Sequence, residues 1–137
     1  MKNIFIACAL LLAGSTLSAQ TKVTVTIENI KGDKGSIRMG VFDKEQDFLK
    51  KAIDGRVVKA NGKEITVVFE NLKPGTYAIS VIHDENENTE LDTKMWIPKE
   101  GIGFSNNVMG NFGPPSFEKA SFTVTDEKTL NIKLKYL

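Results

Sequence analysis

Cysteine is nearly absent from this sequence, and its only copy lies where it would not reach the mature protein. Cys8 sits in an apolar stretch, residues 4–12, which follows the positive Lys2 and precedes a small-residue exit at Ala19. This order is typical of a secretory signal peptide. The segment before Cys8 is too short to be a lipoprotein signal, so we expect no lipid there. The mature chain would then lack cysteine, which excludes disulfides, a thiol nucleophile and thiolate metal sites.

Excess charge and long apolar runs are missing too. Removing residues 1–19 from the 137 leaves 118, with 17 basic against 17 acidic side chains. A net charge of zero gives no basic footprint for nucleic acid, and no remaining apolar run could span a membrane. We therefore predict one exported domain, residues 20–137, that is periplasmic or secreted after cleavage near Ala19-Gln20.

Apolar and polar residues alternate along much of the mature chain. This alternation predicts strands over 21–30, 36–43, both arms of a hairpin at Asn61-Gly62, a strand from Tyr77, and strands over 120–125 and 129–137. About seven short strands separated by turns predict the all-β class and a single antiparallel β-sandwich, transthyretin-like or immunoglobulin-like.

Two local features add detail to this sandwich. Residues 44–52 lose the alternation, and the spacing of Asp43 and Gln46 resembles a helix start, so we predict one short helix with Phe48 and Leu49 packed inward. Asn61-Gly62 suits a type I′ hairpin turn, because both residues tolerate positive φ. That hairpin would pair Lys59 with Glu64 and Val58 with Ile65.

A run of oxygen-bearing side chains follows the strand that begins at Tyr77. Their spacing resembles the front of a calcium loop. The predicted ligands are Asp84, Asn86, Asn88, Glu90 and Asp92. Thr89 stands where such loops favour glycine, and Met95 stands where a helix-loop-helix site has glutamate. The alternatives are a solvated connection rich in Asx turns and a site for another metal.

The other chemistry-bearing residues are few. His83, the sole histidine, is a candidate general base with Asp84 or Ser105 nearby, or else a structural histidine that bonds the loop. Gly101-x-Gly103 is not a dinucleotide fingerprint, because it follows no βα unit. Ser105, Asn106 and Asn107 are expected to shape a packed loop; alternatively, residues 93–117, which include Trp96, form a surface that binds a glycan or a peptide.

Two stretches resemble known families. FENLKPGTY, residues 69–77, resembles a motif of transthyretin-like (prealbumin-like) sandwich modules. A series of segments is similar to the bacterial exported family named domain of unknown function 2141: HDENEN at 83–88, IPKEG at 97–101, GFSNN at 103–107 and GPPSF at 113–117. The second resemblance covers about residues 22–136 and implies an exported sandwich, with no established activity to transfer. Thr89 departs from the glycine common there.

These observations favour an exported module that is not an enzyme and has a structural or binding role at the cell envelope. Its 84–92 loop is the predicted calcium site, and its partner is an envelope glycan or protein, if it has one. A glycan- or peptide-binding module that uses residues 93–117 is the second hypothesis. A hydrolase is the third, although ring hydrolysis in such sandwiches uses several histidines and arginines, and the mature chain has one histidine and two arginines.

Overall fold

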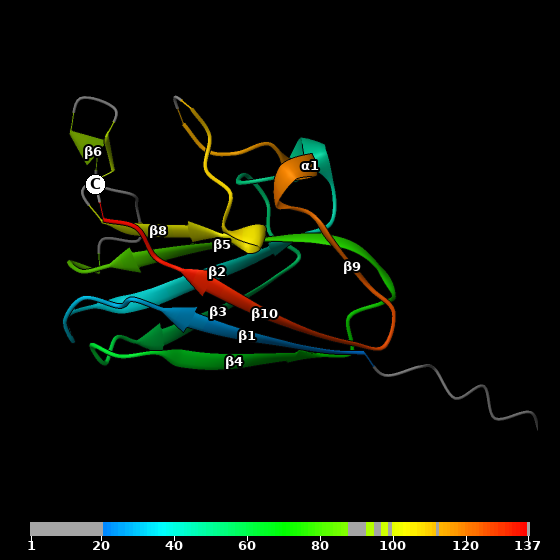
Figure 1. Ribbon diagram of the computed structural model, residues 1–137, viewed down its shortest axis with the longest axis horizontal. Helices are drawn as coiled ribbons and strands as arrows, with labels where there is room; N and C mark the ends of the chain where they lie inside the picture. The colour runs from blue at the N-terminus through cyan, green and yellow to red at the C-terminus, as the bar shows by residue number, and fades with distance from the viewer. Residues whose placement is uncertain (1–20, 88–92, 95–96, 99, 112, 137) are drawn as a thin grey trace, which may run out of the picture.

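The computed structural model describes residues 21–87, 93–94, 97–98, 100–111 and 113–136, and the predicted signal peptide lies outside these residues. Two β-sheets form stacked layers, with short helical segments beyond the outer side of the larger one (Figure 1). The all-β sandwich is therefore confirmed. No helix among the described residues has the length and apolar character needed to cross a membrane.

The smaller sheet has three strands in the order β10-β1-β4. β1 (Lys22–Glu28) and β4 (Ile65–Glu70) run antiparallel, whereas β10 (Glu127–Lys133) runs parallel to β1. Buried apolar positions alternate with less buried positions along β1 and β4; the outward positions are polar except for the exposed Val68. One face of this sheet therefore packs inward and the other faces water.

The larger sheet has the order β3-β2-β5-β8, and β9 pairs with the start of β5. Its strands are β2 (Ser36–Phe42), β3 (Asp54–Lys59), β5 (Gly75–Asp84), β8 (Gly101–Phe104) and β9 (Phe122–Val124). β6 (Thr93–Lys94) and β7 (Ile97–Pro98) form a small separate pair. The helical segments are η1 (Glu45–Asp47), η2 (Ser105–Asn107) and α1 (Phe117–Ala120).

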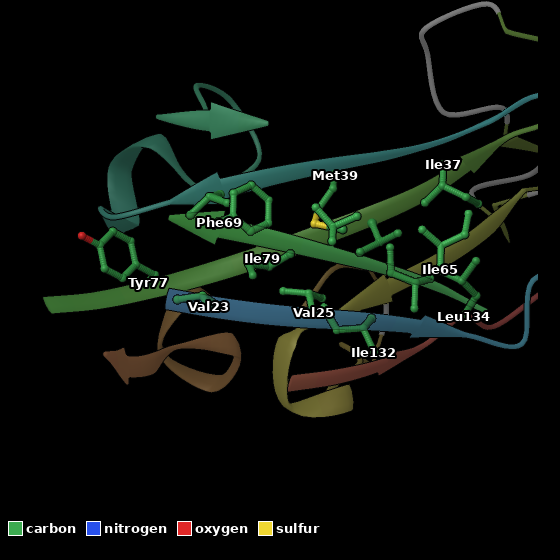
Figure 2. Packing of buried hydrophobic residues seen from close by; sticks show 14 of the residues in the cluster. Val23, Val25, Ile37, Met39, Ile65, Phe69, Tyr77, Ile79, Ile132 and Leu134 are labelled. Carbon is green, nitrogen blue, oxygen red and sulfur yellow. The ribbon is translucent and has the colours of Figure 1, made fainter. Parts of the chain in front are cut away.

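The main core fills the space between the two sheets. Side chains from both inner faces meet there, as Figure 2 shows for Val25 and Ile132 of the smaller sheet and Met39 and Ile79 of the larger. Burial of this apolar surface stabilises the fold by roughly 25 cal/mol for each Å² removed from water.

A second apolar cluster lies on the outer face of the larger sheet. Phe42 and Ala78 come from the sheet, and Phe48 and Ala120 come from the segments that cover it. The rings of Phe42 and Phe48 pack edge to face, with centroids 5.3 Å apart. The outer face is thus covered at the end where β2 finishes, whereas its middle part, around Arg38 and Gly40, is more open.

The predicted hairpin at Asn61-Gly62 is wrong. β3 pairs with β2 and β4 pairs with β1, so the segment between β3 and β4 crosses from one sheet to the other. Gly62 has φ of +69°, but Asn61 does not have the positive φ that a type I′ turn requires. Lys59 lies opposite Ser36, and not opposite Glu64.

The predicted helix over residues 44–52 shrinks to the single 3₁₀ turn η1. The residue before it is Lys44, whose side chain makes no capping bond, so Asp43 does not start the helix. Phe48 is buried as expected, but Leu49 has φ of +62° and is 40% exposed. A left-handed residue cannot continue a right-handed helix, which explains why the segment turns outward there.

Candidate functional site

Asp84, the first of the predicted calcium ligands, ends strand β5 and is buried against an arginine. Its Oδ2 accepts a hydrogen bond of 2.9 Å from Nε of Arg38, and the side chains are 1% and 33% exposed respectively. Ser36 lies opposite Asp84 in the sheet, which places Arg38 one step along on the same face. The carboxylate is therefore anchored to strand β2.

The remaining predicted ligands are described only in part. Asn86 is exposed, and Asn88, Glu90 and Asp92 lie outside the described residues. Within the part of the chain that the structure describes, no group of three or more His, Cys, Asp or Glu side chains is placed to hold a metal ion. The calcium site therefore stays a prediction, because three of its five residues lie outside the described part of the chain.

The turn before β2 packs tightly against the start of this loop. Glu87 accepts a hydrogen bond of 2.7 Å from the hydroxyl of Ser36. Gly35 has φ of +72°, and a Cβ there would lie 2.0 Å from the carbonyl oxygen of Asp84. Only glycine allows this approach, so the loop leaves β5 from a fixed point.

His83 is fully buried, and each of its ring nitrogens has a partner. Nε2 lies 2.7 Å from the carbonyl oxygen of Lys34, and Nδ1 lies 2.8 Å from the hydroxyl of Tyr136. A carbonyl only accepts, so Nε2 donates; in the neutral ring Nδ1 then accepts from Tyr136. The Tyr136 hydroxyl in turn accepts the Lys31 amide N–H at 2.9 Å. His83 is thus held by the turn before β2 and by the end of the chain, an arrangement that favours the structural interpretation.

Tyr136 lies over strand β8 at the end of the chain. A Cβ on Gly101 would lie 2.5 Å from its ring, so the ring needs glycine beneath it. Burial raises the pKa of Tyr136, the Lys31 hydrogen bond lowers it, and the nearby Glu85 carboxylate raises it, with a net upward shift. This partner of His83 was missed, because nothing in the sequence connects two residues so far apart.

The three polar residues of η2 each bind a different part of the fold. Ser105, which is buried, accepts the Ile79 amide N–H at 2.9 Å and donates to the Ala120 carbonyl. Asn106 donates to the carbonyls of Lys119 and Ser121.

Asn107 binds β10, donating to the Asn131 carbonyl and accepting from the Lys133 N–H. The packed-loop interpretation of residues 105–107 is therefore confirmed. Ser105 makes no hydrogen bond with His83 among the described residues.

A groove of about 290 Å³ lies on the open part of the outer face of the larger sheet, and sequence reasoning missed it. Residues in register across three strands line it: Gly55, Gly40 and Ser80 in one row, and Val57, Arg38 and Ile82 in the next. Met39 and Arg56 also line it, but they alternate with these residues and face the other side. The only indication in the sequence is glycine inside two strands, which often marks the close approach of another group.

A scan of known protein families matches residues 25–133 to the family described as "Uncharacterized protein conserved in bacteria (DUF2141)". The chain belongs to the DUF2141 family. The matched range runs from β1 to the end of β10, so in this DUF2141 protein it contains His83, the η2 residues and the groove. No curated protein and no solved structure matches the chain.

The stretch that resembles transthyretin-like modules has a clear structural role in this DUF2141 protein. It joins the end of β4 to the start of β5, and Phe69, Leu72 and Tyr77 from it are buried in the main core. The Tyr77 hydroxyl donates to the Lys73 carbonyl, an upstream backbone bond of a kind found in other sandwiches. The motif therefore fastens the turn between the two sheets.

Proposed function

We propose that the protein is an exported β-sandwich module that is not an enzyme and acts by binding at the cell envelope. The observation that carries this proposal is the state of His83. A general base needs a nitrogen within reach of the proton it removes. Here both ring nitrogens are engaged by groups of the protein, and the side chain has no exposed surface.

Ser105 supports the same proposal. A nucleophilic serine needs an adjacent base and an open approach. Ser105 is buried, and its hydroxyl is held between the backbone of Ile79 and that of Ala120. The residues that sequence reasoning considered for hydrolysis thus have structural partners that account for them.

The test is a hydrolysis screen with ester, amide and glycosidic substrates. Wild-type protein is compared with His83→Gln, whose amide offers both a donor and an acceptor to the same neighbours. We expect no turnover in either protein above that of buffer. Saturable turnover in the wild type that His83→Gln loses would contradict the proposal. Export is tested separately by the intact mass of protein from an exporting bacterium, which should begin at or within two residues of Gln20.

Calcium binding by the 84–92 loop is part of the same proposal. Its support is the spacing of the five oxygen-bearing side chains, together with the anchoring of Asp84, which gives the loop a fixed start. Calcium accepts six to eight oxygens in a flexible shell, whereas magnesium needs a tight octahedron and releases water reluctantly. The site should therefore prefer calcium.

Thermal melting with chelator, calcium and magnesium tests this site. A hundredfold excess of calcium over its dissociation constant should stabilise the fold by about 2.7 kcal/mol, and magnesium by much less. Asp92→Ala should remove most of this response. Asp126→Ala, an exposed change in the turn before β10, should keep it. If the wild-type melting curves with and without calcium superimpose, the loop does not bind calcium, and the alternative of a solvated connection is favoured.

A glycan- or peptide-binding surface at residues 93–117 stays the alternative. Trp96, on which it rests most, lies outside the described residues. A hit on a glycan or peptide array that Trp96→Ala abolishes would favour it over a purely structural role.

A further inference from the structure

The open groove on the larger sheet combines one cation, one hydroxyl and apolar walls. Its floor is low because Gly55, Gly40 and Ser80 lie side by side on β3, β2 and β5, where larger side chains would fill the space. A Cβ on Gly40 would lie 3.2 Å from the Phe42 ring, so the second apolar cluster begins directly beside the floor. The groove is therefore a gap beside the apolar cover, bordered on its other side by Arg38.

Arg38 is the cation of this groove, and its orientation is set from behind. It uses Nε to bind the buried Asp84, and its two terminal nitrogens make no hydrogen bond among the described residues. The guanidinium is a planar fork whose terminal nitrogens suit a carboxylate. Asp84 holds the plane in place at Nε, so little side-chain freedom remains to be lost on binding.

The apolar walls of the groove favour an anion that has an apolar group attached to it. Val57, 58% exposed, lies opposite Arg38 on β3, and Ile82 lies opposite it on β5. The Ser80 hydroxyl makes no hydrogen bond within the described part of the chain. Inorganic anions would leave Val57 and Ile82 in water, whereas an apolar body beside the anionic group would cover them.

From this geometry we propose that the groove binds a small organic carboxylate with a short, branched apolar body. The carboxylate lies on the terminal nitrogens of Arg38 and accepts from Ser80, and the apolar body lies over Gly40 and Gly55, against the neighbouring row that contains Val57 and Ile82. This inference rests on the proposed binding role and assigns it a site. Asp84 offsets part of the charge of Arg38, so binding is weak and depends on the apolar contacts as well.

Isovalerate is a suitable probe, titrated into protein from an exporting host while backbone amide shifts are followed by NMR. We expect saturable shifts centred on Arg38, Gly40 and Ser80. Two controls separate the contributions: isovaleramide has the same apolar body without the charge, and inorganic phosphate has charge without the apolar body. Each should bind with a dissociation constant at least about tenfold higher than that of isovalerate.

A matched pair of variants tests the role of Arg38 without breaking its bond to Asp84. Val57→Asp places a carboxylate on the strand position opposite Arg38 and should weaken isovalerate binding at least about tenfold. Val57→Asn has nearly the same shape as Val57→Asp without the charge, so it loses only the apolar contact and should weaken binding clearly less than Val57→Asp does. Arg38→Lys keeps the charge but loses the fork, and should bind weakly.

Three results would overturn the inference: no saturable shift with isovalerate, equal binding of phosphate, or equal effects of Val57→Asp and Val57→Asn. Failure of the proposed function would give a different result. If the protein were an enzyme, NMR spectra of a substrate mixed with it would show signals from the product. Absent shifts with no turnover would remove the groove as a site and leave the module without catalysis.

Discussion

Tyr136 joins the end of the chain to two earlier segments through a single hydroxyl. It accepts the Lys31 amide and donates to His83, whose other nitrogen donates to Lys34. His83 is buried and Tyr136 is partly buried, whereas Lys31 and Lys34 are exposed. Loss of the Tyr136 hydroxyl therefore leaves Nδ1 of His83 without this partner in a buried place. Such a loss costs about 1–3 kcal/mol for each group left unsatisfied.

Tyr136→Phe should therefore destabilise the protein at neutral pH by about 1–3 kcal/mol, because Lys31 and His83 lose their shared partner. Urea unfolding at pH 7 measures this. Tyr77→Phe is the control, because it removes a hydroxyl that binds only the local Lys73 carbonyl, and it should cost less. Equal losses would show that the bond between Tyr136 and His83 contributes little.

The same residue predicts an alkaline dependence of stability. The pKa of Tyr136 is raised in the folded protein, chiefly by burial, so above pH of about 10 the unfolded chain loses this proton first. Its stabilising contribution is complete below that pH and declines as the pH rises through the folded pKa. The free energy of unfolding should fall less steeply above pH of about 10 in Tyr136→Phe than in wild type; parallel curves would contradict this.

For single residues, the sequence predicts which side chains are buried but not which residues they contact. The alternation through Tyr77, Ile79 and Val81 places His83 on an inner face, and the structure confirms it. Its partner Tyr136 follows strand β10, and only the tertiary arrangement of the strands places it beside His83. The Arg38–Asp84 ion pair was missed for the same reason: alternation assigns a side to each residue, but not its neighbour across the sheet.

Whole elements show a second limit of local patterns. The turn chemistry at Asn61-Gly62 is real, since the Asn61 Oδ1 accepts the Lys63 N–H at 2.9 Å and Gly62 has a positive φ. The same chemistry serves a crossover between sheets as well as a hairpin within one. Which of these forms depends on the strands: Ile27, Val25 and Val23 of β1 offer β4 a row of apolar partners that β3 does not.

Gly62→Val remains destabilising under the corrected topology, because a β-branched residue resists the φ of +69°. The expected loss is about 1–3 kcal/mol. Lys59→Ala, in an exposed position that faces Ser36, should cost at most about 1 kcal/mol, within the range for ordinary surface changes. Thermal or urea unfolding compares the two. Equal shifts would mean that strain at Gly62 is absent.

Asn107 protects the outer edge of β10 with its side chain. Its amide bonds the Asn131 carbonyl at 3.1 Å and the Lys133 N–H at 2.9 Å, as a neighbouring strand would. Asn107→Ala should lower the free energy of unfolding by about 1–3 kcal/mol, because both backbone groups lose their partner. Asn111→Ala, in an exposed position nearby, is the matched control and should have little effect. The reverse order of stability would contradict the role of Asn107.

The whole molecule has one closed side and one open side. At the closed side β8 reaches the smaller sheet, because Ile102 and Lys135 exchange two backbone hydrogen bonds of 2.9 and 2.8 Å. At the open side β3 and β4 are the outer strands of their sheets. Outer strands present unpaired backbone groups that can add another strand.

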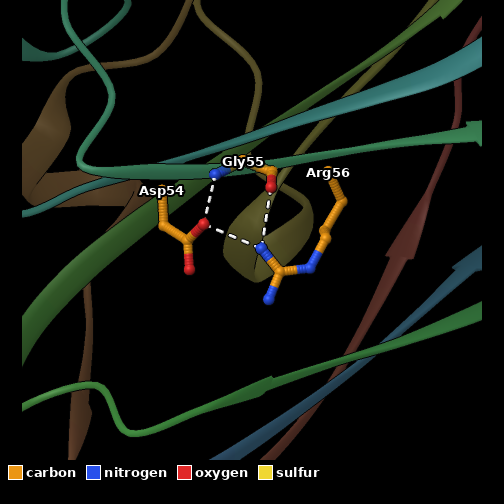
Figure 3. A network of polar contacts seen from close by, with 3 residues as sticks. All are labelled: Asp54, Gly55 and Arg56. Atoms are coloured by element: carbon orange, nitrogen blue, oxygen red, sulfur yellow. Dashed lines mark hydrogen bonds and ion pairs between the residues drawn. The ribbon is translucent and has the colours of Figure 1, made fainter.

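β3 covers its own edge at Gly55, as Figure 3 shows. Asp54 accepts the Gly55 N–H at 2.7 Å, and Arg56 donates to the Gly55 carbonyl at 2.8 Å; Asp54 and Arg56 are also paired with each other. The guanidinium of Arg56 lies 4.6 Å from the centroid of the Phe69 ring, so the same side chain covers the core. Both backbone groups of Gly55 are thus occupied before another strand arrives.

The double variant Asp54→Ala, Arg56→Ala should self-associate more than wild type, because it exposes the Gly55 backbone next to the apolar Val57. Light scattering over a range of protein concentrations measures this. Lys59→Ala, a charge removal on the same strand that leaves Gly55 covered, is the control. If the double variant and wild type have the same mass at every concentration, the edge is protected by something else.

The parallel pairing of β1 with β10 determines when the protein can finish folding. β1 is the first described strand and β10 the last, yet Val25 lies opposite Leu130 and Ile27 opposite Ile132. Folding units built on contacts so distant in sequence form slowly, because a long loop must close first. A chain that emerges from its N-terminus cannot complete its smaller sheet until residues 127–133 have emerged, and until then β1 can pair with β4 along one edge only.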